Sequence, residues 1–332
     1  MAHKWSSVTS DPNFTVVLRK NSRIYISGHT GMLGSALIRT FRDRGYQELF
    51  TVPRQELDLT NKAAVKQFLV AIQPEVILMG AGRVGGIMEN TVHSSDLILE
   101  NLAIQNSLFA TAVEVKSVTA VIYFGSSCIY PSKASQPMNE DLILSATPEL
   151  TSIAYAVAKL AGVITCDAIN QQHGSPKCLA LIPASGYGPN DNFDPESGHV
   201  IGAMIANLHN AKIAGHTSVT LWGTGAPRRD FIYVDDIADA VELLLGKSCL
   251  PVGPLNLSSG QGTSIRDLAG LISSIVEYRG ELLWDHSKLD GAAQKILDSA
   301  RINELGWSPQ TSLAEGIRKT YVWYLRQIAN NN

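Results

Sequence analysis

The chain has 332 residues, of which 17% are charged, and its formal net charge of −3 is small. This length allows one large domain or two smaller ones, and the charge gives no electrostatic basis for binding nucleic acid or anionic membranes. Apolar runs fall short of the roughly 20 residues of a membrane span. The four cysteines have neither paired nor metal-ligand spacing. We therefore expect a soluble cytoplasmic protein without a metal site, a nucleic-acid partner or a membrane partner.

The first 21 residues are polar and mixed, and we expect them to form an extension before the first strand. The stretch 23–27 is typical of a short strand and leads directly into three glycines at positions 28, 31 and 34. Apolar residues then recur with helical spacing from Leu33 to Phe41, and Gly45 supplies a stop signal. Strand, glycine turn and helix in this order predict a dinucleotide site, because the turn brings the pyrophosphate to the helix N-terminus. The residues expected to contact the cofactor there are Gly28, Thr30, Gly31, Met32, Leu33 and Gly34.

Charge at the end of the second predicted strand indicates which cofactor is used. NAD sites place an acidic residue about 20 residues beyond the glycines, whereas a basic residue suits the 2′-phosphate of NADP. Here the strand ends in Val52-Pro53-Arg54, with no acid before Glu56. We expect NADP(H), with Arg54 at the 2′-phosphate and Asp58 near the adenine; the alternative for Arg54 is an ordinary surface arginine.

Strand and helix patterns alternate up to residue 183. Strands are predicted near 23–27, 47–52, 75–80, 118–124 and 177–182. This alternation predicts an α/β fold with a doubly wound parallel sheet of the Rossmann type. We expect an NADP-binding domain over 22–183 and a smaller mixed α/β substrate lobe over 184–332, with segments near 230–260 returning to the first domain.

Three polar side chains indicate chemistry on a carbonyl group. Ser126 follows the apolar run 118–124, and Tyr155 and Lys159 stand four positions apart on a predicted helix. Residues with this spacing share a helix face, so the phenol and the ammonium can enter one site. We expect the cation to lower the pKa of the tyrosine and make it a proton donor and acceptor near neutral pH. The alternatives are an exposed amphipathic pair and an ordinary turn serine.

With these motifs, the chain resembles the GDP-L-fucose synthase family of the extended short-chain dehydrogenase/reductase superfamily over residues 22 to 326. The matching stretches include Gly28-His29-x-Gly31-Met32-x-Gly34, Val84-Gly85-Gly86-Ile87, Gly125-Ser126-Ser127-Cys128-Ile129-Tyr130-Pro131, Gly188-Pro189-Asn190-Asp191-Asn192-Phe193, His199-Val200-Ile201 and Trp222-Gly223-x-Gly225-x-Pro227-x-Arg229. The resemblance implies an NADPH-dependent epimerase-reductase acting on a GDP-4-keto-6-deoxy sugar. It also implies a homodimer packed through helices near 96–115 and 153–172.

The resemblance further assigns Cys128 as the base and His199 as the acid for inversion at C3 and C5, beside the Ser126, Tyr155 and Lys159 site. The alternatives are an inert buried thiol and a histidine that binds substrate. The positions that it implies for substrate binding are Asn207, Trp222, Arg229 and Lys295.

The chain also departs from the family pattern. Ser185 replaces the asparagine of the motif Pro-Thr-Asn-x-Tyr-Gly-Pro, which is common in the family. Asn207 and Gln294 replace arginines, and Thr30 stands where some members carry a second arginine. These departures leave open a C4-reductase of a related GDP-4-keto-heptose or deoxysugar that does not epimerise. An NAD-dependent nucleotide-sugar 4-epimerase and a non-catalytic dinucleotide-sensing protein are further alternatives.

Overall fold

The computed structural model describes Trp5 and residues 18–331 except 176, 196 and 289. Most of the expected N-terminal extension over 1–21 therefore lies outside the described residues. The described residues form a six-stranded parallel sheet in the order β2-β1-β3-β4-β5-β9. Its strands are β1 (Ile24–Ser27), β2 (Leu49–Phe50), β3 (Val76–Met79), β4 (Ala120–Phe124), β5 (Cys178–Pro183) and β9 (Leu255–Leu257). The predicted doubly wound parallel sheet is confirmed.

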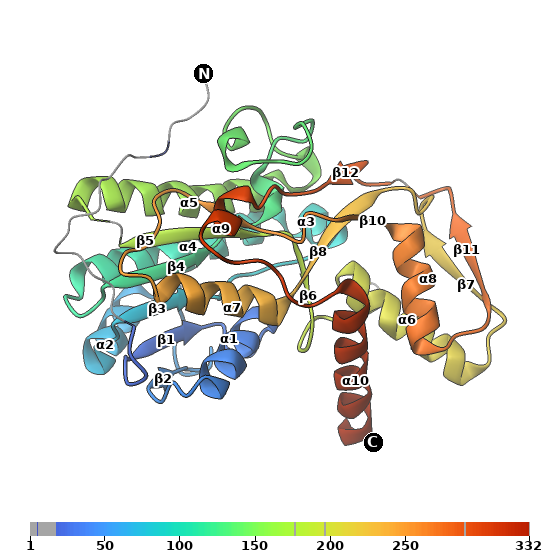
Figure 1. Ribbon diagram of the computed structural model, residues 1–332, viewed down its shortest axis with the longest axis horizontal. Helices are drawn as coiled ribbons and strands as arrows, with labels where there is room; N and C mark the ends of the chain where they lie inside the picture. Colours follow the sequence, from blue (N-terminus) through green and yellow to red (C-terminus); the bar gives the residue numbers. More distant parts are fainter. Residues whose placement is uncertain (1–4, 6–17, 176, 196, 289, 332) are drawn as a thin grey trace.

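Two layers of helices cover the sheet (Figure 1). On one face α1 (Met32–Asp43) packs against α7 (Val234–Leu245), and on the other α4 (Ser94–Glu114) packs against α2 (Lys62–Ile72) and α5 (Ile153–His173). The chain runs from β1 outward to β2 and then returns to β3 on the other side of β1. Ligands of such sheets bind beyond the carboxyl ends of the strands at this point of reversal.

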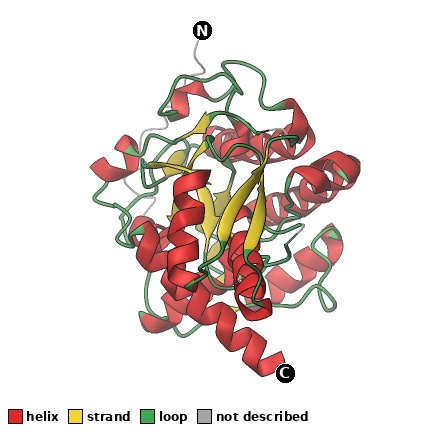
Figure 2. Cartoon of the chain, turned by 90° about the vertical axis from the view of Figure 1, so that its right-hand side faces the viewer, coloured by secondary structure: helices red, strands yellow, loops and turns green. Residues whose placement is uncertain are grey.

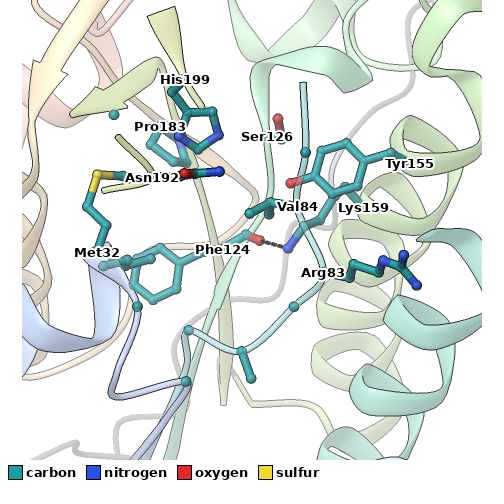
Figure 3. A pocket seen from close by; sticks show the side chains of 18 of the residues that line it. Met32, Arg83, Val84, Phe124, Ser126, Tyr155, Lys159, Pro183, Asn192 and His199 are labelled. Atoms are coloured by element: carbon teal, nitrogen blue, oxygen red, sulfur yellow. Dashed lines mark hydrogen bonds between the residues drawn. The ribbon is translucent and has the colours of Figure 1, made fainter. Parts of the chain in front are cut away.

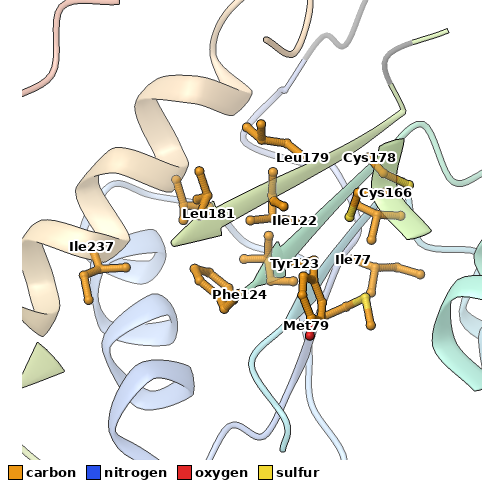
Figure 4. Close-up of a cluster of buried hydrophobic side chains, with 14 of the residues drawn as sticks. Ile77, Met79, Ile122, Tyr123, Phe124, Cys166, Cys178, Leu179, Leu181 and Ile237 are labelled. Atoms are coloured by element: carbon orange, nitrogen blue, oxygen red, sulfur yellow. The ribbon is translucent and has the colours of Figure 1, made fainter. Parts of the chain in front are cut away.

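The apolar core on both faces of this sheet explains why the sequences of its strands are nearly continuous runs of apolar residues. Side chains of β3, β4 and β5 are buried on both faces, among them Ile77, Ile122, Leu179 and Leu181, with Ile237 of α7 packed beside them (Figure 4). Parallel strands covered by helices on both faces are expected to have this composition rather than an alternating one.

The C-terminal part of the chain builds a smaller lobe with a separate apolar core. Its strands are β6 (Ser185–Tyr187), β7 (Ser218–Trp222), β8 (Arg228–Tyr233), β10 (Gly262–Ser264), β11 (Glu281–Asp285) and β12 (Gln294–Lys295). Strand β8 pairs with β6, β10 and β12, and β7 pairs with β11. Helices α6 (Val200–Ala214), α8 (Ile265–Val276) and α10 (Leu313–Asn331) complete the lobe, and the chain ends on α10 (Figure 2). Thus β9 lies in the large sheet, whereas β8 lies in the small one.

Short segments connect these elements near the strand ends. They are the helices α3 (Ile87–Val92) and α9 (Ala300–Glu304) and the single 3-10 turns η1 (Ser127–Ile129), η2 (Glu140–Leu142) and η3 (Leu150–Ser152).

One described helical stretch, Leu150–His173, is long and apolar enough to cross a membrane by length and composition alone, with a mean hydropathy of 1.5. The expectation that no apolar run approaches a membrane span is therefore wrong by that criterion. In the structure this stretch includes α5, which packs against α4, β4 and β5. A core helix of a globular protein has the same composition, so this is weak evidence for a membrane span.

Candidate active site

A cavity of about 1060 Å³ lies beyond the carboxyl ends of the large sheet and extends to the smaller lobe. Its walls come from the glycine turn after β1, the ends of β3 and β4, helix α5, the start of α6, and strands β8 and β12. It thus joins the predicted dinucleotide turn to the predicted Ser126, Tyr155 and Lys159 site. Within the described part of the chain, no cluster of acidic, histidine and cysteine side chains could hold a metal ion.

The glycine turn leaves room for a bound phosphate group. Gly28 has a φ of +68°, and a Cβ there would lie 2.7 Å from the backbone of Ala81. A Cβ on Gly34 would lie 2.2 Å from the carbonyl oxygen of Gly28, so the turn and the helix approach each other closely. Gly31 precedes α1 without a capping side chain, which leaves the helix N-terminus open to an anion. Thr30, Met32 and Leu33 also line the cavity. These residues fit a dinucleotide pyrophosphate.

Arg54 lines the same cavity, but it has an acidic neighbour that the sequence did not reveal. Its Nη1 lies 3.0 Å from Oε1 of Glu100 on α4, and the arginine side chain is 77% exposed. The other oxygen of Glu100 lies 3.6 Å from Arg83. Arg54 therefore remains accessible to a 2′-phosphate while it shares its charge with Glu100.

Asp58, which is expected near the adenine, lies close enough to Arg54 for their charges to interact. Its Oδ1 accepts hydrogen bonds from the backbone N–H and the hydroxyl of Thr60 at 2.9 and 2.8 Å. These bonds lower the pKa of the Asp58 carboxyl, so it is ionised at neutral pH. Asp58 lines the cavity as a fixed hydrogen-bond acceptor.

Ser126, Tyr155 and Lys159 lie together, as their spacing predicts (Figure 3). The hydroxyl of Ser126 lies beside the phenol of Tyr155 (Figure 3). The ammonium of Lys159 lies 5.8 Å from the centroid of the Tyr155 ring and donates a hydrogen bond to the carbonyl oxygen of Phe124 at 3.0 Å. The three side chains form one polar wall at the end of β4.

Burial changes the protonation expected for this wall. It raises the pKa of Tyr155 well above that of a free phenol, although the Ser126 hydroxyl acts in the opposite direction. The expectation that Lys159 lowers the pKa of the tyrosine is therefore wrong, because desolvation dominates and the ammonium is directed at the carbonyl of Phe124. Burial also lowers the pKa of Lys159 to about 8. At neutral pH the tyrosine holds its proton and is suited to donate it.

Cys128 and His199 line the cavity from different elements. Cys128 belongs to η1 and is buried, and burial raises the pKa of its thiol although Ser126, Lys295 and Lys159 act in the opposite direction. His199 precedes α6, and its Nδ1 lies 2.7 Å from Oδ1 of Asp191. This hydrogen bond raises the pKa of His199. In Figure 3, His199 and Tyr155 enter the pocket from different sides.

The four residues implied for substrate binding divide into two pairs. Arg229 on β8 and Lys295 on β12 are paired in the sheet register, and both line the cavity. Asn207, on α6, and Trp222, at the end of β7, are not among the residues that line it. Trp222 is 55% exposed, and the ammonium of Lys288 lies 5.4 Å from its ring centroid.

Two acidic side chains in this region received no role from the sequence, namely Glu100 beside Arg54 and Asp191 beside His199. Asp191 belongs to a sequence block that matches the resembled family, which was the available signal. Their contacts join distant parts of the chain or cross a loop, and local spacing does not predict such contacts.

Residues 24–253 match the pattern of the NAD dependent epimerase/dehydratase family. The chain is 41% identical over 311 residues to GDP-L-fucose synthase 1 of Arabidopsis thaliana, with 94% of this chain and 95% of the relative covered. It is also similar to solved structures of reductases. A GDP-6-OMe-4-keto-L-xylo-heptose reductase from C. jejuni is 30% identical with a TM-score of 0.87, covering 94% of this chain and 99% of that one. A GDP-mannoheptose C4 reductase from Campylobacter jejuni with NADP bound is 31% identical with a TM-score of 0.84, covering 93% and 99%.

Proposed function

The chain belongs to the GDP-L-fucose synthase family, within the NAD dependent epimerase/dehydratase family, and we propose that it is an NADPH-dependent epimerase-reductase of a GDP-4-keto-6-deoxy sugar. The observation that carries this proposal is the single cavity that joins the glycine turn, the Ser126, Tyr155 and Lys159 wall, and the pair Cys128 and His199. A relative solved with NADP bound and the cationic Arg54 support NADP(H) as the cofactor.

In the reduction at C4, each residue of the polar wall has one role. NADPH held by the glycine turn and Arg54 would supply the hydride for the C4 carbon. Tyr155 donates its proton to the developing C4 oxygen, and its raised pKa keeps that proton in place until it is needed. Ser126, which lies beside Tyr155, orients the same oxygen. Lys159 anchors the end of β4 and presents a positive charge beside the site.

Epimerisation uses the protons beside the ketone. A C4 carbonyl acidifies the protons at C3 and C5, so a base and an acid placed around the sugar can invert each centre through an enolate. Cys128 removes a proton as the thiolate; burial disfavours this form, and the nearby Lys159 and Lys295 offset part of that cost. His199 returns a proton as the imidazolium, which Asp191 stabilises. Arg229 and Lys295 supply positive charge for the diphosphate.

The deciding experiment is turnover of GDP-4-keto-6-deoxymannose with NADPH in D₂O, with the product analysed by proton NMR. The proposal requires oxidation of NADPH and deuterium at both C3 and C5 of the product. Without NADPH oxidation the reductase assignment fails, whereas reduction without deuterium leaves a reductase only.

A second candidate is C4 reduction of a GDP-4-keto-heptose without epimerisation. Its support is the similarity to two heptose reductases at 30% and 31% identity. Neither Asn207 nor Gln294, which replace family arginines, lines the cavity, so both candidates use the same polar wall. Assay of a GDP-4-keto-heptose under the same conditions separates the two candidates by relative kcat/KM and by deuterium incorporation.

We also propose a cytoplasmic homodimer without a membrane or nucleic-acid partner, and a division near residue 183 between the NADP-binding domain and the substrate lobe. The dimer is supported by apolar side chains on α4, α5 and the turn before α5 that remain exposed in the single chain: Leu99 at 66%, Leu150 at 73% and Val157 at 41%. Such a group of exposed apolar residues on two packed helices is typical of an association surface.

A further inference from the structure

The carboxylate of Asp191 is buried directly behind His199. Its side chain is 2% exposed, and its Oδ1 lies 2.7 Å from Nδ1 of His199. The same oxygen accepts a hydrogen bond from the backbone N–H of Asn192 at 2.8 Å. The other oxygen, Oδ2, is buried and has no hydrogen-bond partner among the described residues. A buried carboxylate with an unsatisfied oxygen is costly unless a cation lies beside it.

The loop that carries Asp191 is held at both ends. Asn190, in the left-handed region at φ +63°, donates a hydrogen bond from Nδ2 to Oγ of Ser35 on α1 at 2.9 Å. Phe193 stacks on Trp323 and Tyr324 of α10, with ring centroids 5.6 and 4.8 Å apart. The position of the carboxylate is therefore set by contacts to both lobes.

The loop also lies against the first turn of α6. A Cβ on Gly202 would lie 2.5 Å from the carbonyl oxygen of Asn192, so only glycine permits this approach. His199 stands at the start of the same helix, and Figure 3 shows it together with Asn192 on one side of the pocket. The loop segment that carries Asp191 is thus packed against the first turn of α6, which leaves the carboxylate little freedom to turn away from His199.

This geometry determines which ring nitrogen is available for chemistry. A carboxylate only accepts hydrogen bonds, so Nδ1 of His199 must carry a proton to bond with Asp191. The His199 side chain is 40% exposed and lines the cavity, so its second nitrogen, Nε2, is the one left to exchange protons there.

We infer that Asp191 is a positioning residue for His199: it keeps the proton on Nδ1, stabilises the imidazolium, and so makes Nε2 the atom that exchanges a proton with the sugar. This inference deepens the proposed epimerisation and rests on it. The Asp191 side chain is only 2% exposed and is hydrogen-bonded to the imidazole, so its role is exerted through His199.

Other charged groups have a smaller bearing on His199. The start of α6 presents a positive dipole end, which opposes protonation of the imidazole. Cys128, Tyr155, Glu149, Arg229 and Lys295 line the same cavity, and Asp194 lies three residues after Asp191 in the loop. Asp191 is the only one of these side chains that shifts the pKa of His199, and it raises that pKa.

The test is an NMR titration of the histidines in the full-length, ¹⁵N-labelled protein without substrate. In the wild type we expect the neutral form of His199 to carry its proton on Nδ1. Asp191→Asn keeps the shape of the side chain but removes its charge, so the pKa of His199 should fall by about one unit or more. His209, on the same helix but outside the cavity, serves as the internal control, and Asp194→Asn is the matched loop variant. The titration of His209 should not change in Asp191→Asn, and Asp194→Asn should leave the titration of His199 unchanged.

Two results overturn the inference. A neutral wild-type His199 protonated on Nε2 excludes the proposed arrangement without any variant. An unchanged His199 titration in Asp191→Asn shows that the carboxylate does not stabilise the imidazolium.

A second readout connects the pair to turnover. At a pH above both pKa values, a one-unit shift reduces the imidazolium fraction about tenfold, so Asp191→Asn should incorporate deuterium about tenfold more slowly than the wild type at the same pH, and this deficit should disappear at a pH below both pKa values. Loss of incorporation that lower pH does not restore counts against a role through His199. If the wild type incorporates no deuterium, the proposed epimerisation fails, while the titration still decides whether Asp191 sets the state of His199.

Discussion

Lys159 and Phe124 join the catalytic helix to the end of the central strand. The Nζ of Lys159 on α5 donates a hydrogen bond to the carbonyl oxygen of Phe124, the last residue of β4, at 3.0 Å. Ser126 follows Phe124 by two positions, and Tyr155 precedes Lys159 by one helical turn. This one bond therefore helps to set the distance between the serine hydroxyl and the phenol.

Tyr155→Phe should remove the proton donor and leave the shape of the wall intact. We expect turnover to fall by about 10²–10⁴-fold, the usual scale for a general acid. NADPH oxidation measures turnover, and fluorescence titration should show nearly unchanged NADPH binding. Near-normal turnover in this variant would show that another group donates the proton.

The charge on Lys159 should limit activity at high pH. Its pKa is lowered to about 8, so the ammonium is present below that pH and is lost as the pH rises through it. We expect kcat/KM for C4 reduction to fall through the same interval, because this ratio reports groups of the free enzyme. Tyr155 does not titrate there, since its pKa is raised.

His199 must be excluded as the source of that fall, because its pKa is also raised. The profile is therefore best measured in His199→Gln, which retains C4 reduction under the proposed mechanism. A kcat/KM that stays constant up to pH values well above 8 contradicts a role for the Lys159 charge.

Cys128→Ser should separate epimerisation from reduction. A serine hydroxyl is far too weak an acid to supply the base, so deuterium should no longer appear at C3 and C5, while reduction at C4 stays measurable. Cys249→Ser is the matched control, because that cysteine is half-buried and does not line the cavity. Equal incorporation in the wild type and in Cys128→Ser would assign the base to another residue.

Arg54→Ala should weaken NADPH binding selectively. Loss of a charged hydrogen bond costs about 1–3 kcal/mol, and NADH, which lacks the 2′-phosphate, should be affected little. Glu100→Gln should act in the opposite direction, because it removes the carboxylate that lies 3.0 Å from the guanidinium. Isothermal titration with both cofactors measures these effects. Equal losses for NADPH and NADH in Arg54→Ala would remove that residue from the 2′-phosphate.

Leu99→Glu should disrupt the proposed dimer. Leu99 on α4 is 66% exposed, and a buried carboxylate at its position would carry a large desolvation cost. We expect the molar mass measured by light scattering to fall to that of the monomer. Ile213→Glu, at a 72% exposed position near the end of α6, is the matched control. A dimer that survives Leu99→Glu must use another surface.

Local patterns in the sequence predicted the parallel sheet, the helix after the glycine turn and the proximity of Ser126, Tyr155 and Lys159. Each of these depends on spacing within one element or on the order of neighbouring elements. Strand β4 is buried along its length, and α5 places residues four apart on one face. Residues at the carboxyl ends of adjacent parallel strands must then lie at the same edge of the sheet.

Only the tertiary structure brought Glu100 to Arg54, placed the carboxylate of Asp191 behind His199, and left Asn207 and Trp222 off the cavity wall. It also reversed the expected shift of the Tyr155 pKa. These properties depend on which distant elements meet and on how much water they exclude. Periodicity along the chain reports which face of an element is buried, but charge pairing and desolvation are set by atoms that other elements bring within a few ångströms.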